Sequence, residues 1–539
     1  MGLLIFAVCA AVIVAINLLA ELKRDLMMLQ QNSYRNERYL RWLRSSGDTT
    51  SSVRLCAAAA GLFALTSLVP FTVGVSAITL VAWWSLIRLF TAKYKKPLVW
   101  TMRARRIYAA AAVICAAVTA GAVTAAAVTY PSDAGATAMF MTGTITMMWL
   151  YFLSHPVMLA ANWVLRPVEK AITKRYYDDA AARLASMPDL KIIGITGSYG
   201  KTSTKHYLHR ILSEKYSTLM TPGSFNTTLG VVRTVREHLQ PYNEVFIVEM
   251  GAKQPGDIKE ICDLVHPQAA IITAVGEQHL ESFKTVENVQ RTKFELVDAL
   301  PADGFAVVND DFAMSAARKV SNVECVRYSA AGLDSARYEA RDIVYSPSGT
   351  TFTLVDRSGK QDDLKLETRL VGECNISNLM GAVIMARHFG VPDNRIAYAV
   401  AHIDQVEHRL SIKRTSGGIT IIDDAFNSNP SGSKMALDVL ARMTGGQRIV
   451  ITPGMIELGE RQEELNRRFG ASIAVSADVA IVVGHYNREA ITSGIAEVAD
   501  SPCRVLTAET FAEAQRMLGG IVKAGDFVLY ENDLPDTFK

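Results

Sequence analysis

The hydrophobic residues of this 539-residue chain follow two different patterns, and the change falls near residue 165. Before that point, long apolar runs are separated by short charged segments, which is typical of membrane-spanning helices. After it, short apolar runs alternate with longer amphipathic stretches, which is typical of strands and helices in an α/β domain. The pattern predicts an α-helical transmembrane domain over 1–165, followed by α/β domains.

The membrane domain is predicted to contain about five spans. Residues 2–20 are apolar except for Asn17, and we interpret them as a retained anchor because no basic residue precedes them. The run 55–90 is too long for one helix and is interrupted at Pro70, so it predicts two short spans in a hairpin, with one tilted or re-entrant span as the alternative. Two further spans are predicted at 107–128 and 136–164.

The charged segments between these runs predict the orientation. Lysine and arginine are concentrated in 21–54 and 93–106 and are absent from the turn near Pro70 and from 130–137. Positively charged loops stay on the cytoplasmic side, so five crossings return the chain after residue 166 to the cytoplasm of a bacterium, where ATP is present. No acid and no Lys/Arg pair lies inside a predicted span, which favours an anchor over a transporter, and His155 is interpreted as a packed or interfacial histidine and not as a proton relay.

The remainder divides into three parts. Residues 166–190 form a predicted amphipathic linker helix, and residues 191–405 form an ATP-binding domain with a mostly parallel, P-loop-type sheet. Residues 406–539 form a Rossmann-like domain without a dinucleotide fingerprint. Strands are predicted at 245–248, 269–275 and 305–308 in the ATP-binding domain, with a small β excursion over 345–370, and at 419–422, 448–451, 479–483 and 527–530 in the last domain.

A glycine-rich loop within 191–205 (KIIGITGSYGKTSTK) carries the strongest candidate chemistry. A strand leads into it, and a helix is predicted to begin near Lys201, so free backbone N–H groups would face a phosphate. Gly197 and Gly200 allow the backbone to come close, Lys201 supplies positive charge, and the Thr202 hydroxyl can bind Mg²⁺. These features predict an ATP site, with a simple helix cap after a buried strand as the alternative.

Two side chains at neighbouring strand ends extend this site. Glu249 follows one predicted strand, and His279 lies in the loop after the next. Ligands of parallel sheets bind at the carboxyl ends of strands, so a carboxylate and an imidazole facing Thr202 form a candidate Mg²⁺ site. Taken singly, Glu249 could be a solvated strand end and His279 a hydrogen-bonded loop histidine.

Composition excludes other classes of function. The net charge is +3 and the basic residues after the first third are interspersed with acids, so nucleic acid is not a predicted partner. The seven cysteines form no C-x-x-C pair, which gives no indication of a zinc site or of a disulfide framework.

A series of motifs resembles the ATP-dependent Mur ligase family, and within it the branch that adds D-alanyl-D-alanine to a muramoyl tripeptide. The motifs occur in the family's order: TGSYGKTS at 196–203, SFNTTLG at 224–230, VEMGA at 248–252, GEQHLESF at 276–283, RTKFEL at 291–296, VGECNISN at 371–378, EHRL at 407–410, DDAFNSNPSG at 423–432 and PGMIELG at 453–459.

The resemblance implies a role for each matching residue. Lys201, Lys293 and His279 would be catalytic, and Thr202, Glu249, His279 and Lys293 would hold two Mg²⁺ ions, the lysine as a carbamate. Taken alone, Lys293 would be interpreted as an exposed helical lysine. The implied nucleotide contacts are Gly197, Ser198, Gly200, Lys201, Thr202, Ser203, Asn375, Asn378, Arg409 and Asp424, and the implied substrate contacts are Asn226, Thr227, Asn427 and Asn429.

The predicted function is therefore a membrane-anchored amide ligase of cell-envelope synthesis. ATP would convert a carboxylate into an acyl phosphate, which the amine of an amino acid or dipeptide attacks; the carboxylate would belong to a UDP-linked or lipid-linked precursor. Cys374 and Gly454 depart from the family pattern, the acidic segment 530–538 replaces a basic one, and the membrane domain stands in place of a UDP-sugar domain. The alternatives are a poly-γ-amino-acid or lipid-linked peptide ligase, and a nucleotide-binding scaffold without catalysis.

Overall fold

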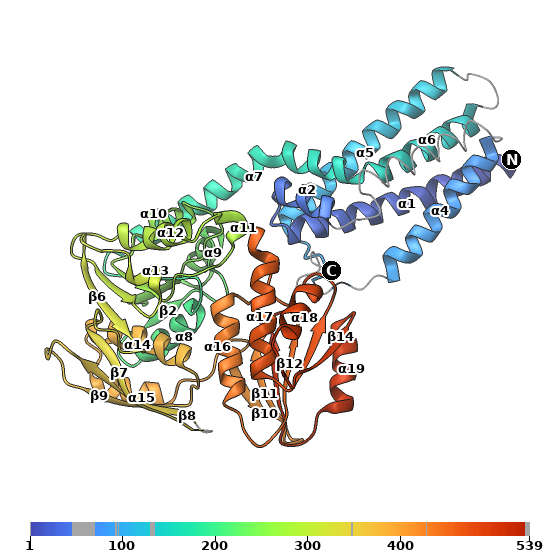
Figure 1. Cartoon of the computed structure of the whole chain (residues 1–539). Coiled ribbons are helices and arrows are strands. Elements are labelled where there is room, and N and C mark those ends of the chain that lie inside the picture. Colours follow the sequence, from blue (N-terminus) through green and yellow to red (C-terminus); the bar gives the residue numbers. More distant parts are fainter. Residues whose placement is uncertain are drawn as a thin grey trace. The chain divides into compact units, whose positions relative to one another are not determined.

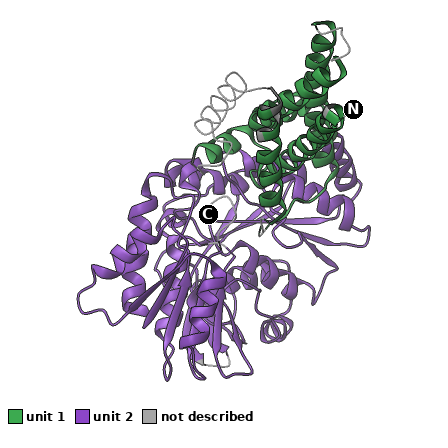
Figure 2. Ribbon diagram, turned by 90° about the vertical axis from the view of Figure 1, so that its right-hand side faces the viewer, with its two compact units in different colours: residues 1–173, 534–539 green, residues 174–533 purple. Residues whose placement is uncertain are grey.

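The computed structural model describes residues 2–45, 71–91, 94, 96–129, 135–346, 349–426 and 428–533. The described residues form two compact units, one ending at residue 173 and the other covering residues 174–533 (Figure 2). We call them the helical unit and the α/β unit and describe each by itself.

The helical unit is built from long helices that pack along one another (Figure 1). Its elements are α1 (Gly2–Gln31), α2 (Asn36–Ser45), α4 (Phe71–Thr91), α5 (Met102–Thr129), α6 (Gly135–Phe152) and the first part of α7 (Ser154–Ala185). Helix α1 contacts α4, α5 and α6, and its buried residues Leu18, Leu22 and Leu26 contribute to one hydrophobic core.

Two described helices are long and apolar enough to cross a membrane, namely Leu4–Gln31 and Met102–Thr129. A third crossing is possible if α6 and α7, which are bent by 76° at their junction, act as one span. Helix α4 coincides with the second half of the predicted hairpin, whereas its first half and the loop after α5 lie outside the described residues. The five-span arrangement therefore stays a prediction.

Helix α1 continues beyond the predicted span limit at residue 20 and ends at Gln31. The charged residues after position 20 are good helix formers, and their spacing explains why the helix continues. Asn17, Glu21 and Asp25 recur every fourth residue, so they share one helix face, and all three are buried. Asp25 Oδ1 lies 3.2 Å from Nδ1 of the buried His155. His155 is packed, which is one of the two predicted placements. Its neighbour Asp25 is an acid that the predicted span, which ended at residue 20, placed in a loop.

The first sheet of the α/β unit has nine strands in the order β2-β3-β1-β4-β5-β6-β7-β8-β9. The strands from β2 to β7 in this order pair in parallel, and β8 and β9 add antiparallel pairs, so the predicted β excursion is an extension of the main sheet. The bounds are β1 (Lys191–Thr196), β2 (Thr218–Met220), β3 (Val245–Glu249), β4 (Ala269–Ile272), β5 (Phe305–Asn309), β6 (Glu324–Ser329), β7 (Tyr338–Ser346), β8 (Gly349–Asp356) and β9 (Leu364–Thr368).

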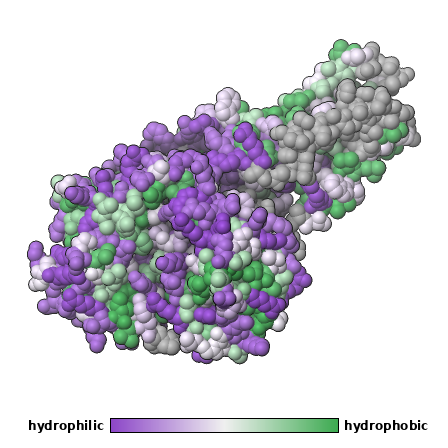
Figure 3. Space-filling view, in the orientation of Figure 1, coloured by the Kyte–Doolittle hydropathy of each residue, from purple (hydrophilic) through white to green (hydrophobic). Residues whose placement is uncertain are grey.

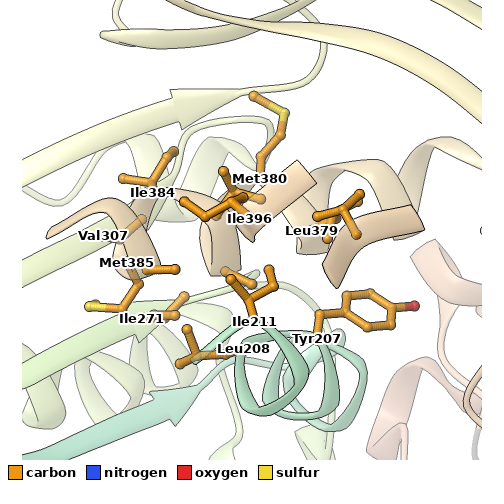
Figure 4. Packing of buried hydrophobic residues seen from close by; sticks show 14 of the residues in the cluster. Tyr207, Leu208, Ile211, Ile271, Val307, Leu379, Met380, Ile384, Met385 and Ile396 are labelled. Carbon is orange, nitrogen blue, oxygen red and sulfur yellow. The ribbon is translucent and has the colours of Figure 1, made fainter. Parts of the chain in front are cut away.

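Helices cover both faces of this sheet, which explains why its central strands are continuously apolar. Alternate residues of β3 enter different cores: Val245 and Ile247 face one, and Phe246 and Val248 the other. The first core lies under α8, α14 and α15 (Figure 4). The helices are α8 (Lys201–Leu212), α9 (Thr228–His238), α10 (Asp257–Val265), α11 (Leu280–Phe283), α12 (Val286–Asp298), α13 (Ala313–Ala316), α14 (Glu373–His388) and α15 (Asp393–Ala401).

The second sheet has six strands in the order β10-β11-β15-β12-β13-β14, and only the β10–β11 pair is antiparallel. Each of the four predicted strands overlaps an observed one, while β10 and β14 were not predicted. The Rossmann-like classification stays a prediction. The elements are β10 (Ser411–Arg414), β11 (Thr420–Asp424), β12 (Arg448–Thr452), β13 (Val479–Val483), β14 (Arg504–Ala508), β15 (Phe527–Glu531), α16 (Pro430–Ala441), η1 (Gly459–Arg461), α17 (Gln462–Ser476), α18 (Arg488–Ala496) and α19 (Phe511–Ile521).

The packing of α14 yields a stability prediction. Leu379 is fully buried in the core next to Tyr207 (Figure 4), so Leu379→Ala should reduce the free energy of unfolding of the α/β unit by about 2–5 kcal/mol. Leu333 is 42% exposed, and Leu333→Ala is the matched control with an expected change within about 0.5 kcal/mol. Urea unfolding followed by circular dichroism measures both, and equal effects would contradict the packing described here.

Candidate functional site

The glycine loop connects β1 to α8 and adopts a backbone that requires glycine. Gly197 and Gly200 have φ angles of 155° and 83°. A Cβ atom on Gly197 would lie 2.1 Å from Thr273 Oγ1, and one on Gly200 would lie 2.2 Å from Asn378 Oδ1. Helix α8 begins at Lys201 without a side-chain cap, so its first N–H groups are available to an anion. This arrangement favours a phosphate site over a simple helix cap.

Lys201 lies across this loop. Its Nζ donates hydrogen bonds to the carbonyl oxygens of Gly197 (2.7 Å) and Ser198 (3.1 Å). Burial lowers the pKa of Lys201 to about 8, although the Glu249 carboxylate raises it. The Ser198 hydroxyl donates to the Gly276 carbonyl oxygen (3.0 Å), which ties the loop to the segment after β4. The ammonium group is thus held where it can meet a phosphate group bound in the loop.

Glu249, at the end of β3, is the centre of a buried polar cluster. Its Oε1 accepts hydrogen bonds from the Thr202 hydroxyl (3.2 Å) and the Asn226 amide (3.0 Å), and its Oε2 accepts one from Lys205 Nζ (2.9 Å). Burial by itself raises the pKa of Glu249, but Lys205 and Lys201 outweigh it and the pKa is lowered. The carboxylate is therefore ionised and is not a solvated strand end.

Lys205 was not predicted as a site residue. It is fully buried and also donates to the Gly223 carbonyl oxygen (2.6 Å). The available signal was its spacing, because a residue four positions after Lys201 lies on the same face of α8. A lysine on that face would point toward the strand end that carries Glu249.

Thr202 and Glu249 have the chemistry to hold Mg²⁺. The two side chains are in contact and present oxygen atoms, the ligands that this ion prefers. In the part of the chain that the structure describes, no group of three or more His, Cys, Asp or Glu residues lies together as a metal site. Mg²⁺ usually takes one or two protein carboxylates and completes its shell with water and phosphate oxygens, so the Thr202 and Glu249 pair fits it.

Two further predicted site residues, His279 and Lys293, both have lowered pKa values. Lys293, on α12, is only 1% exposed, which corrects its interpretation as an exposed helical lysine. Burial, followed by the charge of Lys201, lowers the pKa of Lys293 well below its usual value. His279 Nδ1 contacts the carboxylate of Glu457, and burial lowers the pKa of His279 although Glu457 raises it.

A pocket opens beside the glycine loop and is lined by the domain of the first sheet (β1 to α15) and that of the second sheet (β10 to β15), which we call the first and second sheet domains. Asn375 and Asn378 of α14 lie in its wall, as does Cys374. Asn375 is also bonded within the chain, because its Oδ1 accepts from the Tyr207 hydroxyl (2.9 Å) and its Nδ2 donates to the Val371 carbonyl oxygen (2.9 Å). The full lining is Tyr199, Gly200, Ser203, Ala274, Asn309, Phe312, Cys374, Asn375, Ser377, Asn378, Arg409, Leu410, Asp424, Asn429, Gly432 and Met435.

Arg409 reaches this pocket from the second sheet domain. Its Nη2 lies 3.5 Å from Thr202 Oγ1, and its guanidinium carbon lies 4.0 Å from the centre of the Phe426 ring. Asp424 accepts a hydrogen bond from the Leu410 N–H (3.1 Å), and burial raises the pKa of Asp424 to about 6 although Arg409 lowers it. The chain thus brings a guanidinium and a carboxylate from one domain to the glycine loop of the other.

The four predicted substrate residues have different surroundings. Asn226 contacts Glu249, and Asn429 lines the pocket while its Oδ1 accepts from the Gly432 N–H (2.9 Å). Thr227 caps α9 by accepting from the Gly230 N–H (3.3 Å). Asn427 lies outside the described residues. Their contacts with a substrate stay predictions.

Comparison with known proteins shows which protein family the two sheet domains match. Residues 195–386 match the Mur ligase middle domain, and residues 408–530 match the Mur ligase glutamate ligase domain. UDP-N-acetylmuramoyl-tripeptide–D-alanyl-D-alanine ligases of Bacillus subtilis and Escherichia coli are each 29% identical to the chain. The matches cover 53% of this chain and 60% of the first relative, and 65% of this chain and 77% of the second.

Solved structures agree with the fold. MurF from Acinetobacter baumannii superposes with a TM-score of 0.60 at 25% identity, covering 66% of this chain and 77% of that one. MurF from Thermotoga maritima gives a TM-score of 0.59 at 24% identity and covers 67% of this chain and 80% of that one. The chain thus spans about three fifths of the first relative's length and about four fifths of the second structure.

The buried pair of Lys205 and Glu249 yields a mutational prediction. Lys205→Met should reduce the free energy of unfolding by about 3–5 kcal/mol, because it leaves the Glu249 carboxylate buried without its cationic partner. Lys205→Met combined with Glu249→Gln should recover most of this loss, since neither charge remains. Urea unfolding of both variants measures the effect, and a double variant no more stable than Lys205→Met would contradict the pairing.

Proposed function

The chain belongs to the Mur ligase family, and we propose that it is an ATP-dependent, ADP-forming ligase of cell-envelope precursor synthesis. It would join the carboxylate of a peptidoglycan-type precursor to the amine of an amino acid or dipeptide. One observation carries the proposal: Arg409 of the second sheet domain lies 3.5 Å from Thr202 at the end of the glycine loop. A phosphate group bound by the loop would therefore meet cationic groups from two domains.

The chemistry requires a carboxylate to be activated before an amine can attack it. The substrate carboxylate attacks the terminal phosphorus of ATP, ADP departs, and the resulting acyl phosphate reacts with the amine to give an amide and phosphate. Lys201, with a pKa of about 8, is mainly an ammonium group at neutral pH and would balance charge on the transferred phosphoryl group. Arg409 would add a second cation from the second sheet domain.

The metal ligands proposed here are Thr202, Glu249 and His279 for one Mg²⁺, with carbamylated Lys293 for a second. Mg²⁺, when bound, neutralises charge on the phosphate oxygens. The burial of Lys293 supports the carbamate, because CO₂ reacts only with an uncharged amine and burial favours that form. The contact of Thr202 with Glu249 supports the first position.

The remaining pocket residues would position the nucleotide and exclude water. Asn375 and Asn378 would face the adenine side, and Asp424 would approach the nucleotide from the second sheet domain. Asn226, Thr227, Asn427 and Asn429 would orient the two substrates. Because water would hydrolyse an acyl phosphate, the site needs both domains in place during turnover.

The acceptor is proposed to be membrane-associated. The two apolar helices Leu4–Gln31 and Met102–Thr129 support anchoring in the bacterial cytoplasmic membrane, with the α/β unit in the cytoplasm. Exposed apolar residues on α4 add to this, because Leu80, Trp83, Trp84 and Ile87 share a helical face suited to lipid. Hydrophobic side chains are also visible on the described surface of the helical unit (Figure 3). Tethering raises the effective concentration of a lipid-linked partner, which favours a lipid-linked peptide over a soluble UDP-linked one.

A ligation assay tests the activity. Detergent-purified protein with ATP, Mg²⁺ and a panel of UDP-muramoyl peptides, lipid-linked precursors and amino acids or dipeptides should release phosphate and increase one precursor's mass by one residue or dipeptide. Lys201→Ala should lower this rate by at least about 100-fold, because it removes a charge contact of the transferred phosphoryl group. Lys259→Ala, on the exposed surface of α10, is the matched control and should retain activity.

Two results would contradict this proposal, the first its activity and the second its phosphate site. ATP binding without turnover on the whole panel, poly-γ-amino acids included, would favour a nucleotide-binding scaffold. Full activity of Lys201→Ala would remove the glycine loop from the reaction.

The membrane topology has its own test. Alkaline phosphatase fused after Ser132 should be active, because five spans place this loop outside, whereas a fusion after Trp100 should be inactive in the basic cytoplasmic segment. Fluorescent protein fusions at the same two sites serve as the reciprocal control. An inactive phosphatase after Ser132 together with a fluorescent partner would overturn the proposed orientation.

A further inference from the structure

A carboxylate from the second sheet domain meets the proposed metal ligand His279. Glu457 lies in the loop between β12 and η1, and its Oε2 contacts His279 Nδ1. The two residues have φ angles of 62° and 52°, a left-handed conformation that non-glycine residues adopt at a cost. Such conformations persist only where the surrounding structure holds them, and they are concentrated at functional sites.

Further contacts fix Glu457 against the first sheet domain. Its Oε1 lies 3.7 Å from Lys253 Nζ, and its carbonyl oxygen accepts a hydrogen bond from the Glu281 N–H (3.3 Å) at the start of α11. Nearby, Arg461 pairs with Glu277. The loop bearing Glu457 therefore docks on the segment bearing His279 through both backbone and side-chain contacts.

The contact determines which ring nitrogen of His279 can bind a metal. A carboxylate accepts a hydrogen bond from a nitrogen that bears a proton, so Glu457 favours the neutral ring with its hydrogen on Nδ1 and its lone pair on Nε2. Among the described residues, no hydrogen bond engages Nε2. Histidine ligands of metals commonly donate their other N–H to such a carboxylate, which fixes the orientation of the ring and increases its basicity.

We propose that Glu457 is a positioning residue for the metal site, acting on His279 from the opposite domain. This inference rests on the proposed function, because it takes His279 to be a ligand of the divalent cation. It adds that metal affinity is coupled to the second sheet domain through the Glu457 carboxylate itself. The pair of Arg461 and Glu277 holds the same interface without touching His279.

Mn²⁺ binding to the full-length protein in detergent, measured by electron paramagnetic resonance at saturating ADP, tests the coupling. Glu457→Ala should weaken Mn²⁺ binding about 10- to 100-fold, the usual effect of losing such a partner. Glu457→Gln should bind Mn²⁺ within about threefold of the unmodified protein, because its amide oxygen still accepts from Nδ1–H. Arg461→Ala, the interface control, should also stay within about threefold. The electron spin echo of bound Mn²⁺ should show nitrogen modulation that His279→Ala abolishes and Glu457→Ala weakens.

Three results would overturn the proposal. Unchanged Mn²⁺ affinity and modulation in Glu457→Ala would show that the carboxylate does not position the ligand. An equal loss in Arg461→Ala would show that interface stability alone matters. Nitrogen modulation that survives His279→Ala would remove His279 from the metal. The proposed function fails separately, and this inference with it, if the unmodified protein binds no ADP and Mn²⁺ at all.

Discussion

The need to neutralise one buried carboxylate, Glu249, organises the end of the α/β unit that carries the glycine loop. Parallel pairing sets Ile195 of β1 beside Glu249 of β3, so the glycine loop and the carboxylate lie at the same sheet edge. Lys205 and Thr202 reach Glu249 from α8, and Asn226 reaches it from the loop before α9. An ionised carboxylate away from water requires such partners, so the helix, loop and strand end are held in one arrangement.

The sequence predicted the parts of this arrangement that depend on local pattern. Apolar runs located most parallel strands, since central strands buried on both faces are continuously hydrophobic. The turn geometry required glycine at Gly197 and Gly200, which a sequence can reveal. Lys205 was not predicted as a site residue because a lysine after a glycine loop is ordinarily solvated. Its burial depends on Glu249, which lies 44 positions away in the sequence. The contact of His279 with Glu457 spans 178 positions and joins two domains, so no local pattern contains it.

The helical unit shows how a boundary set by hydropathy alone can be too short. Residues after position 20 are charged, yet α1 continues to Gln31 because Glu21 and Asp25 face the unit's interior. Burial of such groups requires partners, and Arg24 and His155 lie beside them. The helical spacing of positions 17, 21 and 25 indicates that the helix continues beyond residue 20, whereas the mean hydropathy of the segment does not.

We propose above all that one nucleotide site is shared between the two sheet domains, which bring Arg409 Nη2 within 3.5 Å of Thr202 Oγ1. Hydrogen–deuterium exchange of the full-length protein, with and without a non-hydrolysable ATP analogue and Mg²⁺, tests it most directly. The account predicts slower exchange both in the glycine loop, residues 197–202, and in residues 409–424 of the second sheet domain. Protection confined to one of these segments, or absent from both, would contradict it.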